Sequence, residues 1–217
     1  MPDPYTPLLT AFALDAAESA AVAAAMETAD PWGWDSGGAD EAAALQSAKN
    51  KIRAFHLARH GDTCCYCRSI LFGGGHFVID REHILPKGKY KPYSYTIWNL
   101  SASCKRCNMQ YKGSDDSFVV NKVDAALFEA AENYTIVHPN FDKWDDHLDR
   151  ETYQKNSKIL VTYRIVGDSA KGLATYQYFD LEGLVTNSFD EAQGKGGIDA
   201  MSEAGLETLA LAKAFGQ

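Results

Sequence analysis

The chain has 217 residues, of which 46% are hydrophobic, 12% aromatic and 23% charged, and its formal charge is −8. This composition is sufficient for one large or two small folded domains and excludes a disordered tail protein, while the acidic total, taken alone, argues against a nucleic-acid partner. No run of about 18 apolar residues lacks a polar break, and the first residues lack the basic start of a signal peptide, so we expect a cytoplasmic protein without a membrane segment.

Two helices are predicted before residue 60. Residues 11–28 have high helix propensity, with alanine on most faces, and the Pro- and Gly-containing segment 31–38 ends that helix. The second helix, over residues 41–59, has an apolar stripe at helical spacing, formed by Leu45, Ala48, Ile52 and Phe55.

Charge is unevenly distributed along the chain. Residues 49–112 carry twelve Lys and Arg against three Asp and Glu, a net charge of +9, and the segments on either side are acidic. A basic block of this kind fits either a polyanionic partner or a solvated face that binds nothing. The total charge therefore does not decide between these two interpretations.

All five cysteines lie in the basic block. Four of them form two C-x-x-C pairs, Cys64/Cys67 and Cys104/Cys107, and two such turns complete the tetrahedral Cys₄ site that Zn²⁺ prefers. The odd number of cysteines disfavours disulfides, and a thioredoxin-like redox site would use only one pair. We therefore predict a structural zinc ion, with Cys65 as a spare that can substitute for Cys64.

The segment between the two cysteine pairs reads as strand, loop, strand and helix. Residues 76–85 are rich in branched and aromatic side chains, as in a strand, and Pro86 ends them. A basic, aromatic loop follows over residues 87–95, then a short strand over 96–100. A helix is expected to run from about Cys104 to Tyr111.

Five short motifs follow one another in this part of the chain. They are Cys64-x-x-Cys67, Glu82-His83-Ile84-Leu85-Pro86, Asn99-Leu100, Cys104-x-x-Cys107-Asn108 and Lys112-Gly113. In this order and spacing they resemble the HNH endonucleases of the zinc-stapled kind, over residues 60–115, about a quarter of the chain.

The resemblance implies an α+β fold. Its centre would be a ββα-metal motif pinned by the Cys₄ zinc site. The residue patterns outside the motif add flanking α-helices and a small C-terminal α/β extension to the predicted fold. The corresponding segments are an N-terminal helical segment (1–40), the nuclease core with its zinc knuckles (41–120) and a C-terminal accessory region (121–217).

For the site, the resemblance implies that His83 is the general base that activates water, that Asn99 braces the loop and that Asn108 and Glu82 hold the catalytic metal. Many members have His in place of Asn108 and Asp in place of Glu82. The oxygen ligands present here suit Mg²⁺ or Mn²⁺. Because adjacent strand residues point to opposite faces, Glu82 should diverge from His83 and align with Asp80, so Asp80 is kept as a substitute ligand.

The function that the resemblance implies is metal-dependent hydrolysis of phosphodiester bonds in nucleic acid, with DNA favoured over RNA. The candidate phosphate contacts are Lys87, Lys89, Lys91, Arg106 and Lys112. The three loop lysines, which alternate with tyrosines, can equally belong to an exposed hairpin loop. Two alternatives remain open, a zinc-containing nucleic-acid-binding module without catalysis and a subunit that is active only with a partner.

The C-terminal half is less informative. Residues 123–132 read as a helix, 134–144 as a loop, 159–165 as a strand that 173–179 can pair with, and 200–215 as a closing helix. The helical N-terminus and the segment His138-Pro139-Asn140-Phe141-Asp142 resemble, more weakly, nucleases of Septu-type bacterial anti-phage systems, which are encoded beside an ATPase. This resemblance implies acidic flanks that dock an ATPase or another defence-system protein; equally, the flanks can simply cover the zinc motif.

Overall fold

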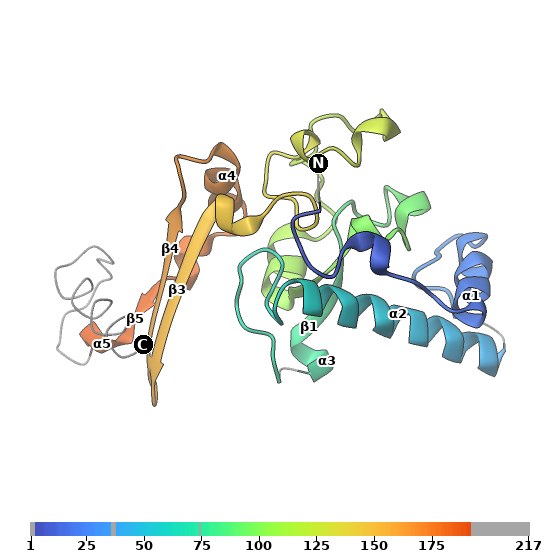
Figure 1. Cartoon of the computed structure of the whole chain (residues 1–217), viewed down its shortest axis with the longest axis horizontal. Coiled ribbons are helices and arrows are strands. Elements are labelled where there is room, and N and C mark those ends of the chain that lie inside the picture. The colour runs from blue at the N-terminus through green and yellow to red at the C-terminus, as the bar shows by residue number, and fades with distance from the viewer. Residues whose placement is uncertain (1–2, 36–37, 74, 192–217) are drawn as a thin grey trace. The chain divides into compact units, whose positions relative to one another are not determined.

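The computed structural model describes residues 3–35, 38–73 and 75–191. The chain divides into two compact units, the first of which ends at Trp144 and the second of which begins at Asp145 (Figure 1). Within these residues, each unit contains helices and one antiparallel sheet, which confirms the mixed α+β class. The functional boundaries at residues 40 and 120 remain a prediction. No helix in the described ranges is long and apolar enough to span a membrane.

Helices α1 (Ala16–Met26) and α2 (Ala39–Arg59) begin the first unit. The predicted start of α1 at residue 11 was wrong, because a capping box fixes its beginning: Asp15 accepts from the Glu18 amide and Glu18 accepts from the Asp15 amide. Glu18 also pairs with Lys51 on α2, at 2.6 Å. The same carboxylate therefore caps one helix and ties it to the next.

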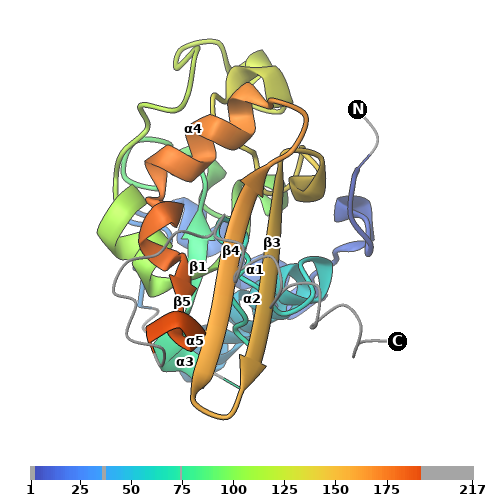
Figure 2. The same cartoon turned by 90° about the vertical axis from the view of Figure 1, so that its left-hand side faces the viewer.

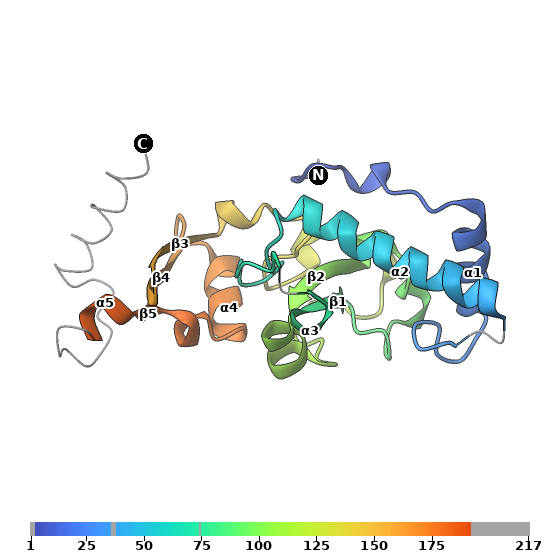
Figure 3. The same ribbon diagram turned by 90° about the horizontal axis from the view of Figure 1, so that it is seen from below.

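The predicted apolar stripe of α2 is confirmed. Its members Leu45, Ala48 and Ile52 are buried, and Phe55 is half-buried. Leu45 forms a small core with Ala21 and Ala25 of α1. Further along, α2 lies against β2, as Figure 3 shows.

Strands β1 (Ile79–His83) and β2 (Leu100–Cys104) form an antiparallel pair in which His83 lies opposite Leu100. A helical turn, α3 (Gly75–Val78), precedes β1, and a π-helix (Arg106–Lys112) follows β2. The predicted order of strand, loop, strand and helix is confirmed.

The predicted bounds of both strands were wrong. Residues 75–78 are helical, and the second strand begins only at Leu100, because Ile97–Asn99 forms a 3₁₀ turn. The side chain of Asn99 bonds the main chain of Leu85, so this part of the chain is held by a side chain instead of a strand ladder.

The predicted helix over 123–132 was also wrong. This segment contains the 3₁₀ turns Ala125–Leu127 and Ala131–Asn133. Asn133 accepts from the Asn121 amide and donates to the Asn121 carbonyl, and these bonds hold the segment in a loop.

The second unit is a sheet in the order β3-β4-β5, with α4 (Ala170–Tyr178) beside it (Figure 2). The sheet is antiparallel, and the remaining bounds of the unit are β3 Leu148–Lys155, β4 Lys158–Ile165, β5 Thr186–Asn187 and α5 Ser188–Glu191. The strand predicted over 159–165 is therefore confirmed.

Pairing of residues 173–179 with that strand was wrong, because 173–178 belong to α4 and Phe179 caps its end. Ser169 caps this helix by accepting from the Gly172 amide, and a side chain at Gly172 would collide with the main-chain oxygen of His147. The helix predicted over 200–215 lies outside the described residues.

Candidate metal centre and active site

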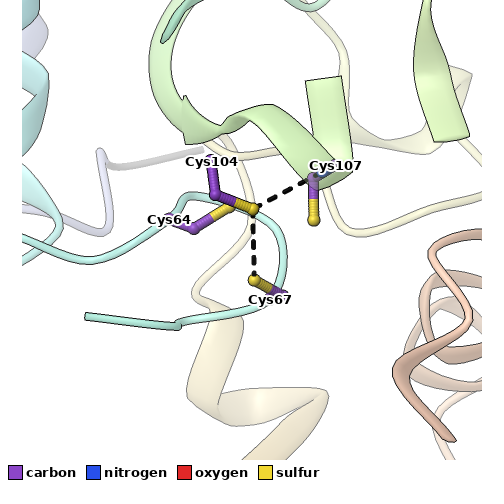
Figure 4. Close-up of side chains that lie close together, drawn as sticks. All are labelled: Cys64, Cys67, Cys104 and Cys107. Atoms are coloured by element: carbon purple, nitrogen blue, oxygen red, sulfur yellow. Dashed lines mark hydrogen bonds between the residues drawn. The ribbon is translucent and has the colours of Figure 1, made fainter. Parts of the chain in front are cut away.

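Cys64, Cys67, Cys104 and Cys107 converge on one point of the first unit (Figure 4). Their sulfur atoms all lie within 4.8 Å of one another, and the Cys67 and Cys104 sulfurs are 3.8 Å apart. A tetrahedron with Zn–S bonds of about 2.3 Å has sulfur–sulfur edges of about 3.8 Å. The cluster could therefore hold a metal ion, and its donor set and size fit zinc.

The first cysteine turn is shaped by its backbone. The Cys64 amide donates to the Ser69 carbonyl, the Arg68 amide donates to the Cys64 carbonyl, and Arg68 has a left-handed φ of 55°. Cys65 is buried but lies outside the cluster, and its amide donates to the Ala102 carbonyl of β2. The turn therefore presents Cys64 and Cys67 to the metal position while Cys65 attaches it to the sheet.

The two faces of the β1–β2 pair carry different side chains. Glu82 lies opposite Ser101 and Asp80 opposite Ser103, so these four residues share one face. Glu82 and Asp80 contact Lys112 and Asn108 of the π-helix, which places that helix on the same side. The ring of His83 instead contacts Trp32 and the Ser94 carbonyl. The side chains of Glu82 and His83 therefore diverge, as expected.

His83 is held in one orientation at the end of β1. Its Nε2 lies 3.0 Å from the Ser94 carbonyl oxygen, and because a carbonyl only accepts, Nε2 carries the hydrogen and Nδ1 keeps its lone pair. The indole of Trp32 packs edge-to-face on the imidazole, with ring centres 4.4 Å apart, and His83 is only 8% exposed. This burial lowers the pKa of His83 to about 3.

Asn99 braces the segment that follows His83. It is fully buried, its Oδ1 accepts from the Leu85 amide at 2.7 Å, and its Nδ2 donates to the carbonyls of Leu85 and Tyr93. These are the contacts expected of a bracing residue, and they fix the main chain on both sides of the loop that carries Ser94.

Glu82 does not fit the role of a metal ligand in this structure. Its side chain is fully buried, and Oε1 accepts from Lys112 at 2.9 Å and from the Tyr66 hydroxyl at 2.9 Å. Burial raises the pKa of Glu82 above its usual value in spite of the neighbouring ammonium. The predicted phosphate contact by Lys112 was wrong, because the lysine side chain is 1% exposed and faces this carboxylate.

Asp80 and Asn108 fit a hard cation better. Both are half-buried, and Asn108 Nδ2 donates to Asp80 Oδ2 at 3.3 Å, so the two side chains are in direct contact. The hydroxyl of Ser103, opposite Asp80, is buried without a partner among the described residues. Among the described residues, the cysteine cluster is the one group of three or more His, Cys, Asp or Glu side chains that could hold a metal ion.

The remaining basic residues predicted to contact phosphate differ in their exposure and in their ion pairs. Lys87 is exposed and lies 4.0 Å from Asp30, and Lys89 is exposed but pairs with Asp116 at 2.8 Å. Lys91 is half-buried at the start of a 3₁₀ turn. Their roles in nucleic-acid binding remain predictions.

The aromatic residues near these lysines are packed inside the unit. Tyr90 is buried against Phe128, and Tyr95 packs on Trp32, so neither is an open platform for a base. Arg106, the fourth remaining basic candidate, stacks on Tyr111 with its guanidinium 4.3 Å from the ring centre.

Three residues that surround the candidate site were missed in the sequence. Trp32 covers His83, Ser94 bonds it, and Tyr66 bonds Glu82. Only Tyr66 had a usable signal, because an aromatic hydroxyl inside a C-x-x-C turn must point to a polar partner when it is buried.

No family model matches the chain, and comparison with curated proteins and with solved structures finds no match. What the site can do is therefore inferred from its own residues and contacts.

Proposed function

We propose that this protein is a metal-dependent endonuclease of the HNH type, which hydrolyses phosphodiester bonds in nucleic acid, with DNA as the favoured substrate. The observation that carries the proposal is the hydrogen bond of His83 at the end of β1, in which the Ser94 carbonyl holds Nε2 and leaves Nδ1 as the basic nitrogen. A general base needs a ring nitrogen with a free lone pair, and this hydrogen bond leaves that lone pair on Nδ1.

The other residues have supporting roles in this proposal. The zinc cluster fixes the two ends of the motif, and Asn99 holds the loop after His83. Asp80 and Asn108 would hold Mg²⁺ or Mn²⁺, which supplies positive charge to a phosphate and its leaving oxygen. His83 Nδ1 would take the proton of the attacking water.

Trp32 must move before His83 can act. The indole covers the imidazole, and its segment is attached by the bond from Lys49 Nζ to the Trp32 carbonyl and by the bond from the Tyr95 hydroxyl to the Pro31 carbonyl. A ring whose pKa is about 3 is a weak base at neutral pH. Displacement of Trp32 would hydrate the ring and raise its pKa toward the ordinary value of about 6.5.

Replacement of Trp32 by Ala is therefore expected to make His83 reactive. The rate of His83 carbethoxylation by diethylpyrocarbonate, followed by peptide mass spectrometry at pH 7, should rise at least about tenfold. Modification of His147 in the same samples provides the reference. An unchanged His83 rate would show that the indole does not shield the ring.

The function itself is tested by plasmid cleavage in Mg²⁺ and in Mn²⁺. The wild type should cleave, and His83→Ala should lose about 100-fold or more of the rate while binding DNA equally well, because the general base is lost and the phosphate contacts are not. His147→Ala, in the second unit, is the matched control and should cleave as the wild type does. Equal cleavage by wild type and His83→Ala would refute the assigned base.

One observation favours a second candidate, a nucleic-acid-binding module without catalysis. His83 is 8% exposed, as a structural histidine would be. In that case the wild type binds DNA and cleaves none under any metal, with or without an ATPase partner of the kind that the weaker resemblance implies.

A further inference from the structure

Lys112 forms a fully enclosed ion pair with Glu82. The Nζ atom lies 2.9 Å from Glu82 Oε1, and the two side chains are 1% and 0% exposed. The same ammonium donates to the His83 carbonyl at 2.7 Å and approaches the Gly113 carbonyl at 3.4 Å. An ammonium has three N–H donors, and these three oxygens account for them.

The carboxylate of Glu82 joins three elements at one point. Tyr66, from the first cysteine turn, donates its hydroxyl to Glu82 Oε1, and Lys112 reaches the same oxygen from the end of the π-helix. Glu82 itself precedes His83 on β1. The turn that carries the metal ligands, the strand that carries the proposed base and the helix that carries Asn108 are therefore connected through this one group.

We infer that Lys112 is a positioning residue: its ammonium holds the main chain of His83 in place and, by occupying Glu82, keeps that carboxylate out of the coordination of a catalytic cation. The inference rests on the proposed function, because the group that is positioned is the proposed base. It departs from the ligand set that the resemblance implies, in which Glu82 binds the metal.

The cost of the alternative supports this assignment. A divalent cation bound by Glu82 would compete with Lys112 for the carboxylate and would leave a buried ammonium without a counter-ion, which is strongly unfavourable. The second oxygen, Oε2, is buried and has no partner among the described residues. A cation from solvent would have to pass buried atoms to reach it. Asp80, half-buried beside Asn108, has no such competitor within the described ranges.

Lysine labelling tests the ion pair in the zinc-loaded 217-residue chain without any variant. Acetylation by an N-hydroxysuccinimide ester, measured by peptide mass spectrometry, should be about 100-fold slower at Lys112 than at Lys87, because Lys112 must open before it reacts. Addition of Mn²⁺ should leave Lys112 protected. Labelling of Lys112 as fast as Lys87, with or without Mn²⁺, would overturn the inference.

Two isosteric variants separate the candidate ligands. Mn²⁺ affinity, measured by electron paramagnetic resonance, should fall at least about tenfold in Asp80→Asn, which loses a charged ligand, and stay within about twofold in Glu82→Gln. Glu82→Gln should at the same time accelerate the labelling of Lys112, because the counter-ion is gone. Loss of Mn²⁺ binding in Glu82→Gln, with Asp80→Asn unaffected, would overturn the inference. Circular dichroism confirms that each variant is folded.

Kinetics distinguish positioning from substrate contact. Lys112→Met should lower kcat with KM unchanged, and Lys112→Arg should restore part of kcat, because an arginine keeps the charge on Glu82. A raised KM with unchanged kcat would assign Lys112 to substrate binding and overturn the inference. A wild type that cleaves no nucleic acid refutes the proposed function instead, and the labelling experiment then still decides whether Lys112 is held on Glu82.

Discussion

Removal of zinc from the cysteine cluster is expected to unfold the unit that ends at Trp144. The four sulfurs bring the Cys64–Cys67 turn to the Cys104–Cys107 turn across 36 intervening residues. Apparent zinc-binding energies at such sites are about 10–16 kcal/mol at pH 7, as large as the whole stability of a small domain, about 5–15 kcal/mol. Without the ion, the unit would have to keep its sheet intact, and that sheet has only two strands of five residues each.

The measurement is a chelator titration followed by circular dichroism, with the zinc content determined by mass spectrometry. We expect about one zinc per chain, and cooperative loss of structure as it is removed. Re-addition of Zn²⁺ should restore the signal, whereas Mg²⁺ should not, because a site made of four thiolates selects a soft metal.

Cys67→Ser and Cys65→Ser form a matched pair for this test. Both residues are buried, two positions apart, but only Cys67 belongs to the cluster. Cys67→Ser should lose tight zinc binding and lower the melting temperature sharply. Cys65→Ser should keep one zinc, because its contact with β2 is made by the main-chain amide. Equal zinc content in the two variants would show that Cys67 is not a ligand.

The parts of this site that sequence reasoning located are those with local causes. The two-residue gap inside each cysteine pair brings both thiols to one side of a turn, and period-two alternation alone places Asp80 and Glu82 on the face opposite His83. The main-chain bonds of Asn99 also have a local cause, because a side-chain amide beside a turn commonly bonds the main chain.

The parts that were missed depend on contacts between distant residues. Trp32 and His83 are 51 positions apart, and no periodicity in either segment indicates that they meet. Lys112 was misassigned for a related reason. A lysine in a basic segment is ordinarily solvated, and its burial here depends on a carboxylate 30 residues earlier. The sequence therefore identified Glu82 as an acidic residue and Lys112 as a basic residue, but it did not indicate that the two form an ion pair.

Acidification is expected to destabilise the first unit through its buried histidines. Burial lowers the pKa of His83 and of His56 to about 3, and the pKa of His60 lies well below its usual value for the same reason. For His56 the nearby main chain of Ile97 opposes the shift without cancelling it. His56 and His83 are therefore neutral in the folded chain at pH 5, and His60 binds a proton more weakly than an ordinary histidine. In the unfolded chain all three rings bind protons below about pH 6.5.

The sign of the effect follows from proton binding. Below about pH 6.5 the unfolded state binds more protons than the folded state, so the free energy of unfolding falls as the pH falls, until His83 and His56 titrate in the folded state near pH 3. Each histidine contributes a slope of up to about 1.4 kcal/mol per pH unit, and three together up to about 4 kcal/mol per unit. By pH 4, three such rings remove up to about 10 kcal/mol, which is comparable to the whole stability of a small domain, about 5–15 kcal/mol.

Urea denaturation at pH 7.5, 6.5, 5.5 and 4.5 measures this slope, and His56→Leu isolates the contribution of one ring. Acid also protonates the zinc-bound thiolates, but loss of zinc affects wild type and variant alike, so the difference between their slopes reports His56. The variant should lose up to about 1.4 kcal/mol per pH unit of the wild-type slope between pH 6.5 and pH 4.5. Parallel curves for the two chains would mean that His56 binds its proton equally well in the folded state, and burial would then not control its charge.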